Sequence, residues 1–209
     1  MNVNPAAILF DLDGVLIDSE GLYTAFWDAT EKLFPTGIPD FARYIKGTNL
    51  DSIMKLFKPE ERDEIMARIL DFDSHLVYPM FPGAEELLAL LADSGIPAAL
   101  VTSSNPEKME QLYRQYPHFR EYFATIVNGS MVSRGKPDPE SYLLAASMLG
   151  KEPAECIVVE DSLQGIRAGR AAGCEVWGLH TTLPRAVVEP EATFTFADIN
   201  EVLDAMRNC

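Results

Sequence analysis

The amino-acid sequence predicts an α/β protein in which a doubly wound parallel sheet carries a small all-helical insert. Short, almost uninterrupted apolar runs recur along the chain, and such runs are typical of strands that are buried on both faces of a parallel sheet. Segments with helical periodicity alternate with these runs, as right-handed βαβ crossovers require. The stretch from about residue 18 to residue 81 breaks this alternation and contains no convincing strand pattern, so we expect it to be the helical insert.

Five apolar runs are expected to form the strands. The first, Ala-Ala-Ile-Leu-Phe, stops at the acidic Asp11 and has the pattern of a central strand. The expected strands cover residues 6–10, 98–101, 125–127, 156–159 and 175–179. The expected crossover helices lie around residues 84–94, 106–116, 139–149 and 163–172. In the last of these helices, small residues such as Gly165 favour close packing on the sheet.

Prolines and glycines divide the insert into helical segments. One segment, from residue 60 to residue 78, places Ile65, Ile69 and Leu76 at near-helical spacing. We therefore expect two domains. The core consists of residues 1–17 and 82–209, and the helical domain consists of residues 18–81.

Charge, cysteine content and hydropathy exclude several classes of protein. The 209 residues include 17 Lys and Arg against 32 Asp and Glu, and the resulting net charge of −15 repels nucleic acid and anionic lipid. The 3 cysteines are too few and too scattered for a disulfide framework or a thiolate metal site. We find no signal-peptide pattern and no run of about 18 apolar residues. We expect a cytoplasmic globular protein, by default a monomer, that binds neither nucleic acid nor membrane.

Polar residues that could carry chemistry follow the expected strands directly. Ligands of open α/β sheets bind outside the carboxyl ends of the strands. The residues expected at this edge are Asp11, Asp13, Thr102, Ser103, Lys136, Glu160 and Asp161. Four carboxylates at one edge repel one another unless a cation neutralises them, and an all-oxygen set favours Mg²⁺ together with phosphate oxygens. A phosphate group is therefore the natural substrate group, and a carboxylate could attack its phosphorus.

Four motifs, in this order along the chain, resemble the signatures of the haloacid dehalogenase superfamily and in particular its β-phosphoglucomutase-like phosphatase branch. They are Asp-Leu-Asp-Gly-Val-Leu-Ile-Asp-Ser-Glu at 11–20, Thr-Ser at 102–103, Gly-Lys-Pro-Asp-Pro at 135–139 and Val-Glu-Asp-Ser-Leu-Gln-Gly at 159–165. The resemblance extends from residue 6 to about residue 180. It implies a Rossmann-like core with a helical cap inserted at residues 18–81.

The resemblance also implies roles for individual residues. Asp11 resembles the nucleophile, and Asp13 resembles the general acid and base that protonates the leaving oxygen and then activates water. Thr102 resembles the hydroxyl that binds the transferred phosphoryl group, with Ser103 and nearby backbone amides beside it. Lys136 resembles the lysine that pairs with the nucleophile and the phosphate. Cations should favour ionised Asp11, whereas a like-charged neighbour would promote protonated Asp13.

A Mg²⁺ ion is implied by the same resemblance. Asp161 and Asp11 resemble its direct carboxylate ligands, the Asp13 carbonyl completes the set, and Glu160 is expected to act through water. In the cap, the loop at Lys46 resembles the one that enters the active site of capped relatives and contacts substrate. A surface lysine in an interhelical turn is the alternative for Lys46.

Structural alternatives stay open at several of these positions. Lys136 could be a solvated loop lysine, and Glu160 with Asp161 could form an ordinary strand-to-helix turn capped by Ser162. Residues 102–105 also form a good helix N-cap sequence, which is compatible with phosphate binding because a helix N-terminus attracts anions.

We expect a Mg²⁺-dependent phosphatase that acts on a small phosphorylated metabolite through an aspartyl phosphate. A sugar-phosphate mutase is the alternative enzyme, and a non-catalytic phosphate-binding module is the alternative without catalysis. The mutases that the sequence resembles carry an arginine in the cap loop and a histidine early in the first cap helix, where Leu50 and Tyr23 stand here. Dehalogenation and phosphonate cleavage are disfavoured, since enzymes with those activities usually lack the second aspartate, which is Asp13 here.

Overall fold

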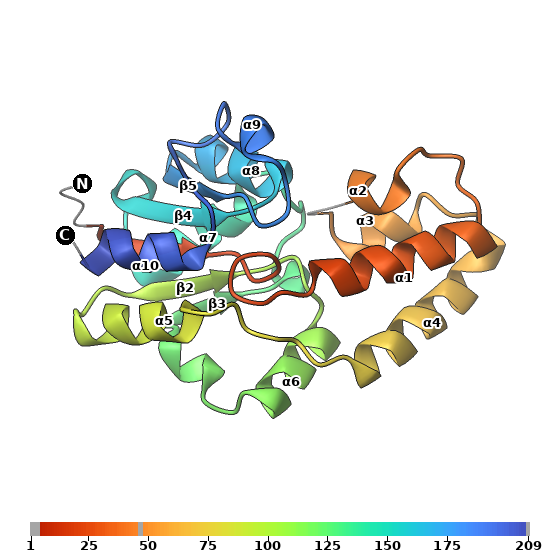
Figure 1. The fold of residues 1–209 in the computed structure, drawn as a ribbon, viewed down its shortest axis with the longest axis horizontal. Coiled ribbons are helices and arrows are strands. Elements are labelled where there is room, and N and C mark those ends of the chain that lie inside the picture. The colour runs from red at the N-terminus through yellow and green to blue at the C-terminus, as the bar shows by residue number, and fades with distance from the viewer. Residues whose placement is uncertain (1–4, 46–47, 208–209) are drawn as a thin grey trace.

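The computed structural model describes residues 5–45 and 48–207. Within these residues, six strands form a parallel sheet in the order β3-β2-β1-β4-β5-β6 (Figure 1). The strands are β1 (Ala7–Phe10), β2 (Ala98–Val101), β3 (Thr125–Val127), β4 (Cys156–Glu160), β5 (Glu175–Leu179) and β6 (Phe194–Phe196). Because β1 lies between β2 and β4, the polar segments that follow these three strands meet at one edge of the sheet.

The predicted fold class is confirmed, and the five predicted strands agree with the structure to within one residue at each end. The sixth strand, β6, was not predicted because its three residues, Phe-Thr-Phe, are too few for a periodic pattern. It pairs with β5 at the edge of the sheet, where 39% of Phe194 remains exposed.

Two layers of helices cover the two faces of the sheet. One layer consists of α5 (Ala84–Asp93), α6 (Pro106–Gln115) and α10 (Ile199–Arg207), and the other consists of α7 (Glu140–Leu149), α8 (Leu163–Ala172) and α9 (Arg185–Val188). Alternate strand residues supply the two cores, so Phe10 is buried in the first layer and Leu9 in the second. In the described part of the chain, the helices are too short or too polar to cross a membrane.

The chain between β1 and α5 forms helices that pack around a core of their own. These helices are α1 (Glu20–Leu33), α2 (Phe41–Tyr44), α3 (Leu50–Met54) and α4 (Arg62–His75), and they lie beyond one end of the sheet (Figure 1). The rings of Trp27, Phe41 and Phe57 contact one another in this core, with centroid distances of 5.1–6.2 Å. The helix predicted within residues 60–78 is observed as α4, which buries Ile65 and Ile69 in the same core.

The two segments that connect α1–α4 to the sheet lie side by side. Ile17 and Met80 form an isolated antiparallel bridge, and the Asp18 N–H donates to the Pro79 carbonyl at 2.8 Å. The chain therefore enters and leaves the helical insert through one hydrogen-bonded neck. Ser19, which follows this neck, is completely buried.

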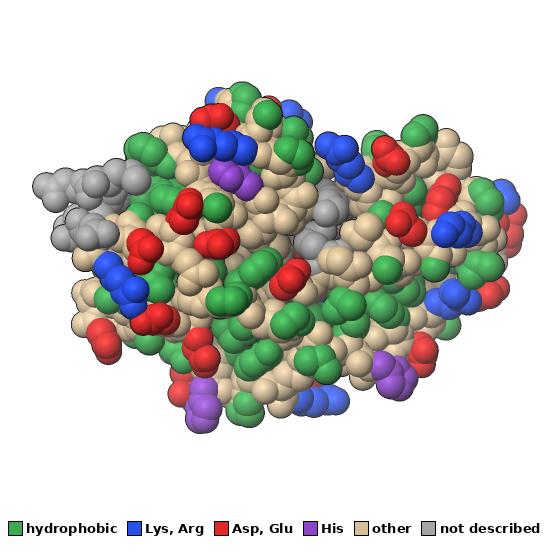
Figure 2. Space-filling model, viewed as in Figure 1, with side chains coloured by type: hydrophobic (Ala, Val, Ile, Leu, Met, Phe, Trp, Pro, Cys, Tyr) green, Lys and Arg blue, Asp and Glu red, His purple; other side chains and the backbone are tan. Residues whose placement is uncertain are grey.

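Charged side chains of both signs lie on the face of the molecule that Figure 2 shows. On the described part of the face in Figure 2, Lys and Arg side chains lie scattered among acidic ones. Exposed ion pairs also occur, and Arg167 and Arg170 both pair with Glu191, at 2.8 and 3.1 Å. The excess of acidic residues is therefore distributed over this face, and the basic side chains do not gather in one patch there.

Candidate active site

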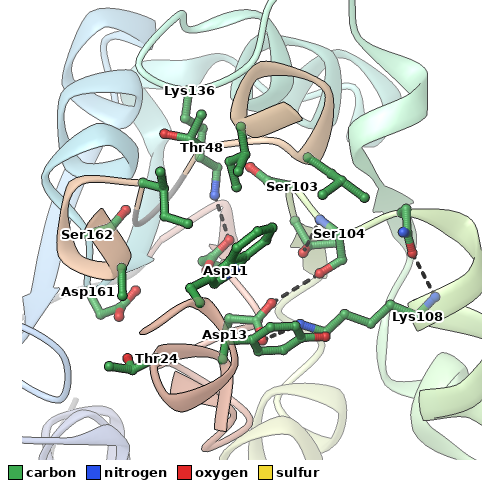
Figure 3. A pocket seen from close by; sticks show the side chains of 18 of the residues that line it. Asp11, Asp13, Thr24, Thr48, Ser103, Ser104, Lys108, Lys136, Asp161 and Ser162 are labelled. Atoms are coloured by element: carbon green, nitrogen blue, oxygen red, sulfur yellow. Dashed lines mark hydrogen bonds and ion pairs between the residues drawn. The ribbon is translucent and has the colours of Figure 1, made fainter. Parts of the chain in front are cut away.

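A tight turn after β1 carries the two predicted aspartates. The Leu12 carbonyl accepts hydrogen bonds from three of the N–H groups that follow it, so the chain folds back directly after the strand. Gly14 has a φ of +77°, and a Cβ atom at this position would overlap the Asp161 carboxylate. The turn therefore packs against the end of β4, and the side chains of Asp11 and Asp13 line the same pocket (Figure 3).

Lys136 connects the Asp11 carboxylate to that of Glu160. Its ammonium donates to Asp11 Oδ1 at 2.6 Å, to Glu160 Oε1 at 2.7 Å and to the Val101 carbonyl at 3.1 Å. The ammonium lies 4.9 Å from the centroid of the Tyr142 ring, and only 3% of the Lys136 side chain is exposed. Lys136 is thus a buried cation, and the alternative of a solvated loop lysine is wrong.

Both oxygens of the completely buried Glu160 accept hydrogen bonds. Oε1 accepts from Lys136 and from the Tyr142 hydroxyl at 2.9 Å, and Oε2 accepts from two N–H groups and one hydroxyl that lead into α8. The Ser162 side chain also caps α8, so the predicted strand-to-helix turn is present together with this buried cluster. A Cβ atom on Gly165 would overlap the Glu160 carboxylate, so this glycine leaves room for Glu160 besides any role in helix packing.

Three carboxylates lie close enough to share one cation. Oxygens of Asp11, Glu160 and Asp161 all lie within 4.8 Å of one another, and each of these residues is at most 9% exposed. Hard oxygen ligands suit Mg²⁺, and a divalent cation would relieve the repulsion among buried carboxylates. The donor set therefore fits Mg²⁺.

Burial and neighbouring charges shift the pKa values of Asp11 and Lys136. Burial raises the pKa of Asp11 to about 7, Lys136 opposes this rise, and Glu160 adds to it. Lys136 thus favours ionised Asp11, as expected, although its charge does not outweigh the effect of burial. Burial disfavours the Lys136 ammonium, but the charges of Asp11 and Glu160 raise its pKa above the ordinary value. Lys136 thus remains a cation at physiological pH.

Asp13 accepts hydrogen bonds from three side chains, which belong to two distant segments of the chain. Lys108 Nζ on α6 donates to Oδ1 at 2.6 Å, Ser104 Oγ donates to Oδ2 at 3.1 Å, and Ser19 Oγ at the neck donates to Oδ1. Burial would raise the pKa of Asp13, but the charge of Lys108 and these hydrogen bonds hold the pKa below its usual value. The expected shift toward protonated Asp13 is therefore wrong, because the charge of Lys108 and the three hydrogen bonds favour the ionised carboxylate.

The segment after β2 forms another wall of the pocket. Thr102 and Ser103 both line the pocket, and Thr102 Oγ1 accepts a hydrogen bond from the Ser104 N–H at 3.0 Å. Asn105 caps α6 by accepting from the Lys108 N–H at 2.8 Å, which confirms the predicted N-cap sequence. The N-terminus of α6 therefore lies next to the carboxylates, where it favours an anion.

The helical insert closes the pocket on the side opposite the sheet. Its lining residues, mostly apolar or aromatic, are Tyr23, Thr24, Trp27, Ala42, Ile45, Thr48, Leu50, Ile53 and Asp73. Lys46, the predicted substrate contact, lies outside the described residues. The pocket is therefore polar toward the sheet and largely apolar toward α1–α3.

Lys108, Ser19 and Tyr142 were not predicted to belong to the site. Lys108 stands in the first turn of α6, where a cation opposes the helix dipole, and this unfavourable placement is a signal in the sequence. Ser19 resembles an ordinary helix N-cap, and Tyr142 occupies one of the buried positions of α7. Their roles depend on contacts between distant segments, which local patterns do not show.

Known proteins provide an independent comparison. A family model described as haloacid dehalogenase-like hydrolase matches residues 5–173. The chain is 33% identical over 214 residues to the phosphorylated carbohydrates phosphatase of Thermotoga maritima, covering 96% of this chain and 98% of that protein. It is 29% identical over 222 residues, or 96% of its length, to the bifunctional riboflavin kinase/FMN phosphatase of Arabidopsis thaliana, but it spans only 53% of that longer protein.

A solved structure agrees along almost the whole chain. The crystal structure of a HAD family hydrolase from Deinococcus radiodurans, with bound phosphate and sodium, has a TM-score of 0.77 and 28% identity, covering 99% of this chain and 97% of that one. The region matched by the family model begins just before β1 and includes Asp11, Lys136 and Asp161, which meet in the pocket. Sequence, fold and pocket thus agree that the chain belongs to the haloacid dehalogenase-like hydrolases.

Proposed function

We propose that the chain is a Mg²⁺-dependent phosphatase that hydrolyses a small phosphorylated metabolite, a sugar phosphate or a related phosphomonoester, through an aspartyl phosphate on Asp11. One observation carries the proposal: the Asp11 carboxylate lies 2.6 Å from the buried Lys136, beside Asp161 and in one pocket with Asp13. These groups supply a nucleophile, a cation, a metal ligand and a proton carrier, which phosphoryl transfer through a carboxylate needs. The name of the Thermotoga relative supports the substrate class.

In the first half-reaction, the pocket positions the phosphoryl group beside Asp11. Thr102 and Ser103, in the segment between β2 and α6, bind its oxygens, and Lys136 places a positive charge next to them. An Asp11 oxygen attacks phosphorus while the bond to the leaving oxygen breaks. Asp13, whose pKa rises when the phosphate charge lies beside it, gives its proton to the leaving oxygen.

In the second half-reaction, water replaces the leaving group. Asp13 accepts a proton from this water as its oxygen bonds to phosphorus, and the bond between phosphorus and Asp11 breaks. Phosphate is released and the Asp11 carboxylate is restored. Ser19, Ser104 and Lys108 hold Asp13 in place between the two steps.

Mg²⁺ would be held by Asp11, Asp161 and the Asp13 carbonyl, with Glu160 contributing through water. When bound, it would neutralise charge on the phosphoryl oxygens. Glu160 has a second role in this proposal: its buried carboxylate fixes the Lys136 ammonium at 2.7 Å and so keeps the lysine beside Asp11.

We infer that residues 18–81 act as a cap on a core formed by residues 1–17 and 82–209. Helices α1–α3 line the pocket, and the neck at Ile17 and Met80 is the connection about which a cap could move. A closed cap would exclude bulk water from the aspartyl phosphate. Lys46 fits the role of a substrate contact, since its neighbours Ile45 and Thr48 both line the pocket.

Hydrolysis is favoured over mutase chemistry by the composition of the pocket wall. A mutase must hold a bisphosphorylated intermediate at both ends, which requires cations on the cap for the distal phosphate. Leu50 and Tyr23 line the pocket at the positions where the mutases that the sequence resembles carry their arginine and histidine. Water should therefore take the phosphoryl group from Asp11.

Two measurements test this proposal. A panel of phosphorylated metabolites is incubated with the protein and Mg²⁺, and released phosphate is measured; phosphate binding without turnover on any compound would indicate a binding module. β-Glucose 1-phosphate is then supplied with catalytic glucose 1,6-bisphosphate. Efficient formation of glucose 6-phosphate with little free phosphate would show that the chain is a mutase.

A further inference from the structure

We propose that Lys108 selects the substrate: its ammonium binds a hydrogen-bond-accepting oxygen, a hydroxyl or a carboxylate, on the carbon next to the esterified carbon. This inference rests on the proposed phosphatase function and names the substrate feature that the pocket recognises. Lys108 belongs to α6 in the core, so this contact adds a core residue to the substrate contacts of the proposed cap.

The two described lysines of the pocket differ in how their donors are used. Lys136 donates to Asp11, Glu160 and Val101, which accounts for all three of its N–H groups. Among the described residues, the Lys108 ammonium donates to Asp13 alone, although Lys108 is only 6% exposed. Unpaired donors on a buried ammonium are costly. Lys108 therefore has donors to offer to a ligand in the pocket.

Aromatic rings hold the Lys108 ammonium in position. The centroid of the Tyr23 ring lies 4.3 Å from Nζ, and that of the Tyr78 ring lies 5.3 Å from it, so both rings provide cation–π contacts. The Tyr23 hydroxyl donates to Asp73 at 2.6 Å, which fixes this ring. The ammonium is thus surrounded by Asp13 and two rings, and it faces the pocket that Lys108 lines (Figure 3).

Asp13 sets the distance between Lys108 and the substrate. In the proposed reaction Asp13 forms a hydrogen bond of about 2.6–3.2 Å to the leaving oxygen. Lys108 Nζ lies 2.6 Å from the Asp13 carboxylate. The ammonium is therefore separated from the leaving oxygen by two consecutive hydrogen bonds, one from Lys108 to Asp13 and one between Asp13 and the leaving oxygen. An acceptor on the carbon next to the esterified carbon comes within reach of the ammonium. A methyl group at that place has no acceptor, and an ammonium group there is repelled by Lys108.

Four matched phosphoesters test the inference on the Mg²⁺-loaded enzyme. Ethyl phosphate, 2-hydroxyethyl phosphate, phosphoglycolate and 2-aminoethyl phosphate carry a methyl, hydroxymethyl, carboxylate or aminomethyl group next to the esterified carbon. We expect kcat/KM for the hydroxyl or the carboxylate compound to exceed that for ethyl phosphate by about tenfold to hundredfold, the effect of one hydrogen bond to a charged group. The 2-aminoethyl compound should be the poorest substrate. The order of the hydroxyl and carboxylate compounds shows which acceptor is preferred.

Variants connect this preference to Lys108. In Lys108→Met the ratio of kcat/KM values for the acceptor compound and ethyl phosphate should fall to about one, and Lys108→Arg should restore part of it. Lys55→Met, which alters an exposed lysine, should keep the wild-type ratio. The ratio within one variant is unaffected by a general loss of activity, and circular dichroism confirms that each variant is folded.

If Lys108→Met hydrolyses the esters too slowly for kcat/KM to be measured, the binding of substrate analogues tests the inference instead. Calorimetry gives the dissociation constants of 3-hydroxypropylphosphonate and propylphosphonate, in which a methylene group replaces the ester oxygen. The hydroxylated compound should bind more tightly to wild type and equally to Lys108→Met. The inference would be overturned if the wild type did not prefer the compounds that carry an acceptor, or if Lys108→Met kept that preference. Absence of phosphate release from these four esters and from the wider metabolite panel would instead refute the phosphatase function.

Discussion

Lys136→Met removes the cation between Asp11 and Glu160 and nearly preserves the length of the side chain. In the wild type Nζ lies 2.6 and 2.7 Å from the two carboxylates, whose side chains are 12% and 0% exposed. Without the ammonium, two buried carboxylates face each other uncompensated, which costs about 3–5 kcal/mol. For a chain of 209 residues, each kcal/mol lowers the Tm by about 2–4 °C, so we expect a decrease of about 6–20 °C.

The dependence of this decrease in Tm on salt and pH shows whether buried charges cause it. The ion pairs are buried, so salt screens them little, and the decrease in Tm should be similar at about 0.05 and about 0.5 M salt. The contribution of an exposed ion pair would be weaker at the higher salt concentration. Lys136 lowers the pKa of Asp11, so its removal raises that pKa further above the unfolded value near 3.8. A carboxyl group whose pKa is higher in the folded state than in the unfolded state destabilises the folded protein at pH values above the folded-state pKa. This destabilisation decreases as the pH falls and the carboxyl group becomes protonated. The difference in Tm between variant and wild type should therefore narrow from pH 8 to pH 5.

Differential scanning calorimetry of matched variants checks this reasoning. Lys55→Met removes an exposed lysine and should change the free energy of unfolding by less than about 0.5 kcal/mol. Lys136→Met with Glu160→Gln should be less destabilised than the sum of the single variants, because the remaining charge repulsion is smaller. A decrease in Tm below about 2 °C for Lys136→Met, or one that disappears at high salt, would refute the buried-pair account.

Further predictions concern turnover. Asp13→Asn should lower kcat by about 10²–10⁴-fold with the fold retained, because the amide cannot exchange the proton, and a loss of only a few-fold in a steady-state assay would contradict this role. Excess chelator should abolish phosphate release and added Mg²⁺ should restore it, whereas full activity in excess chelator would show that the reaction does not require Mg²⁺. Asp161→Asn should raise the Mg²⁺ concentration needed for half-maximal activity, as a Mg²⁺ titration would show. Tyr142→Phe removes the 2.9 Å hydrogen bond to Glu160 and should cost about 1–3 kcal/mol in chemical denaturation; unchanged stability would show that this bond is dispensable.

The sequence was sufficient to predict the parts of the fold that rest on local patterns. The apolar runs of β1 and β4 are continuous because both faces of these strands are buried, so their positions could be read directly. The polar residues that follow them had to converge once the strands were parallel and adjacent. Asp11, Lys136 and Asp161 could therefore be placed at one edge without knowledge of any side-chain contact.

Other parts depend on contacts that no local pattern records. The strand β6 has three residues and gains its regularity from pairing with β5. Lys108, on α6, reaches Asp13 although the two residues are 95 positions apart in the sequence. The charge of Lys108 and the hydrogen bonds from Lys108, Ser19 and Ser104 lower the pKa of Asp13, and the sequence suggested the opposite direction because it did not show these contacts.

The covalent intermediate on Asp11 is the central claim, and rapid quench followed by peptide mass spectrometry tests it most directly. The protein is mixed with Mg²⁺ and a substrate from the panel, stopped with acid within one turnover and digested. We predict the added mass of one phosphoryl group on the peptide that contains Asp11, assigned to that residue by fragmentation and missing in Asp11→Asn. Release of phosphate with no phosphoryl group on Asp11, with one on another residue, or with undiminished turnover in Asp11→Asn would contradict the account.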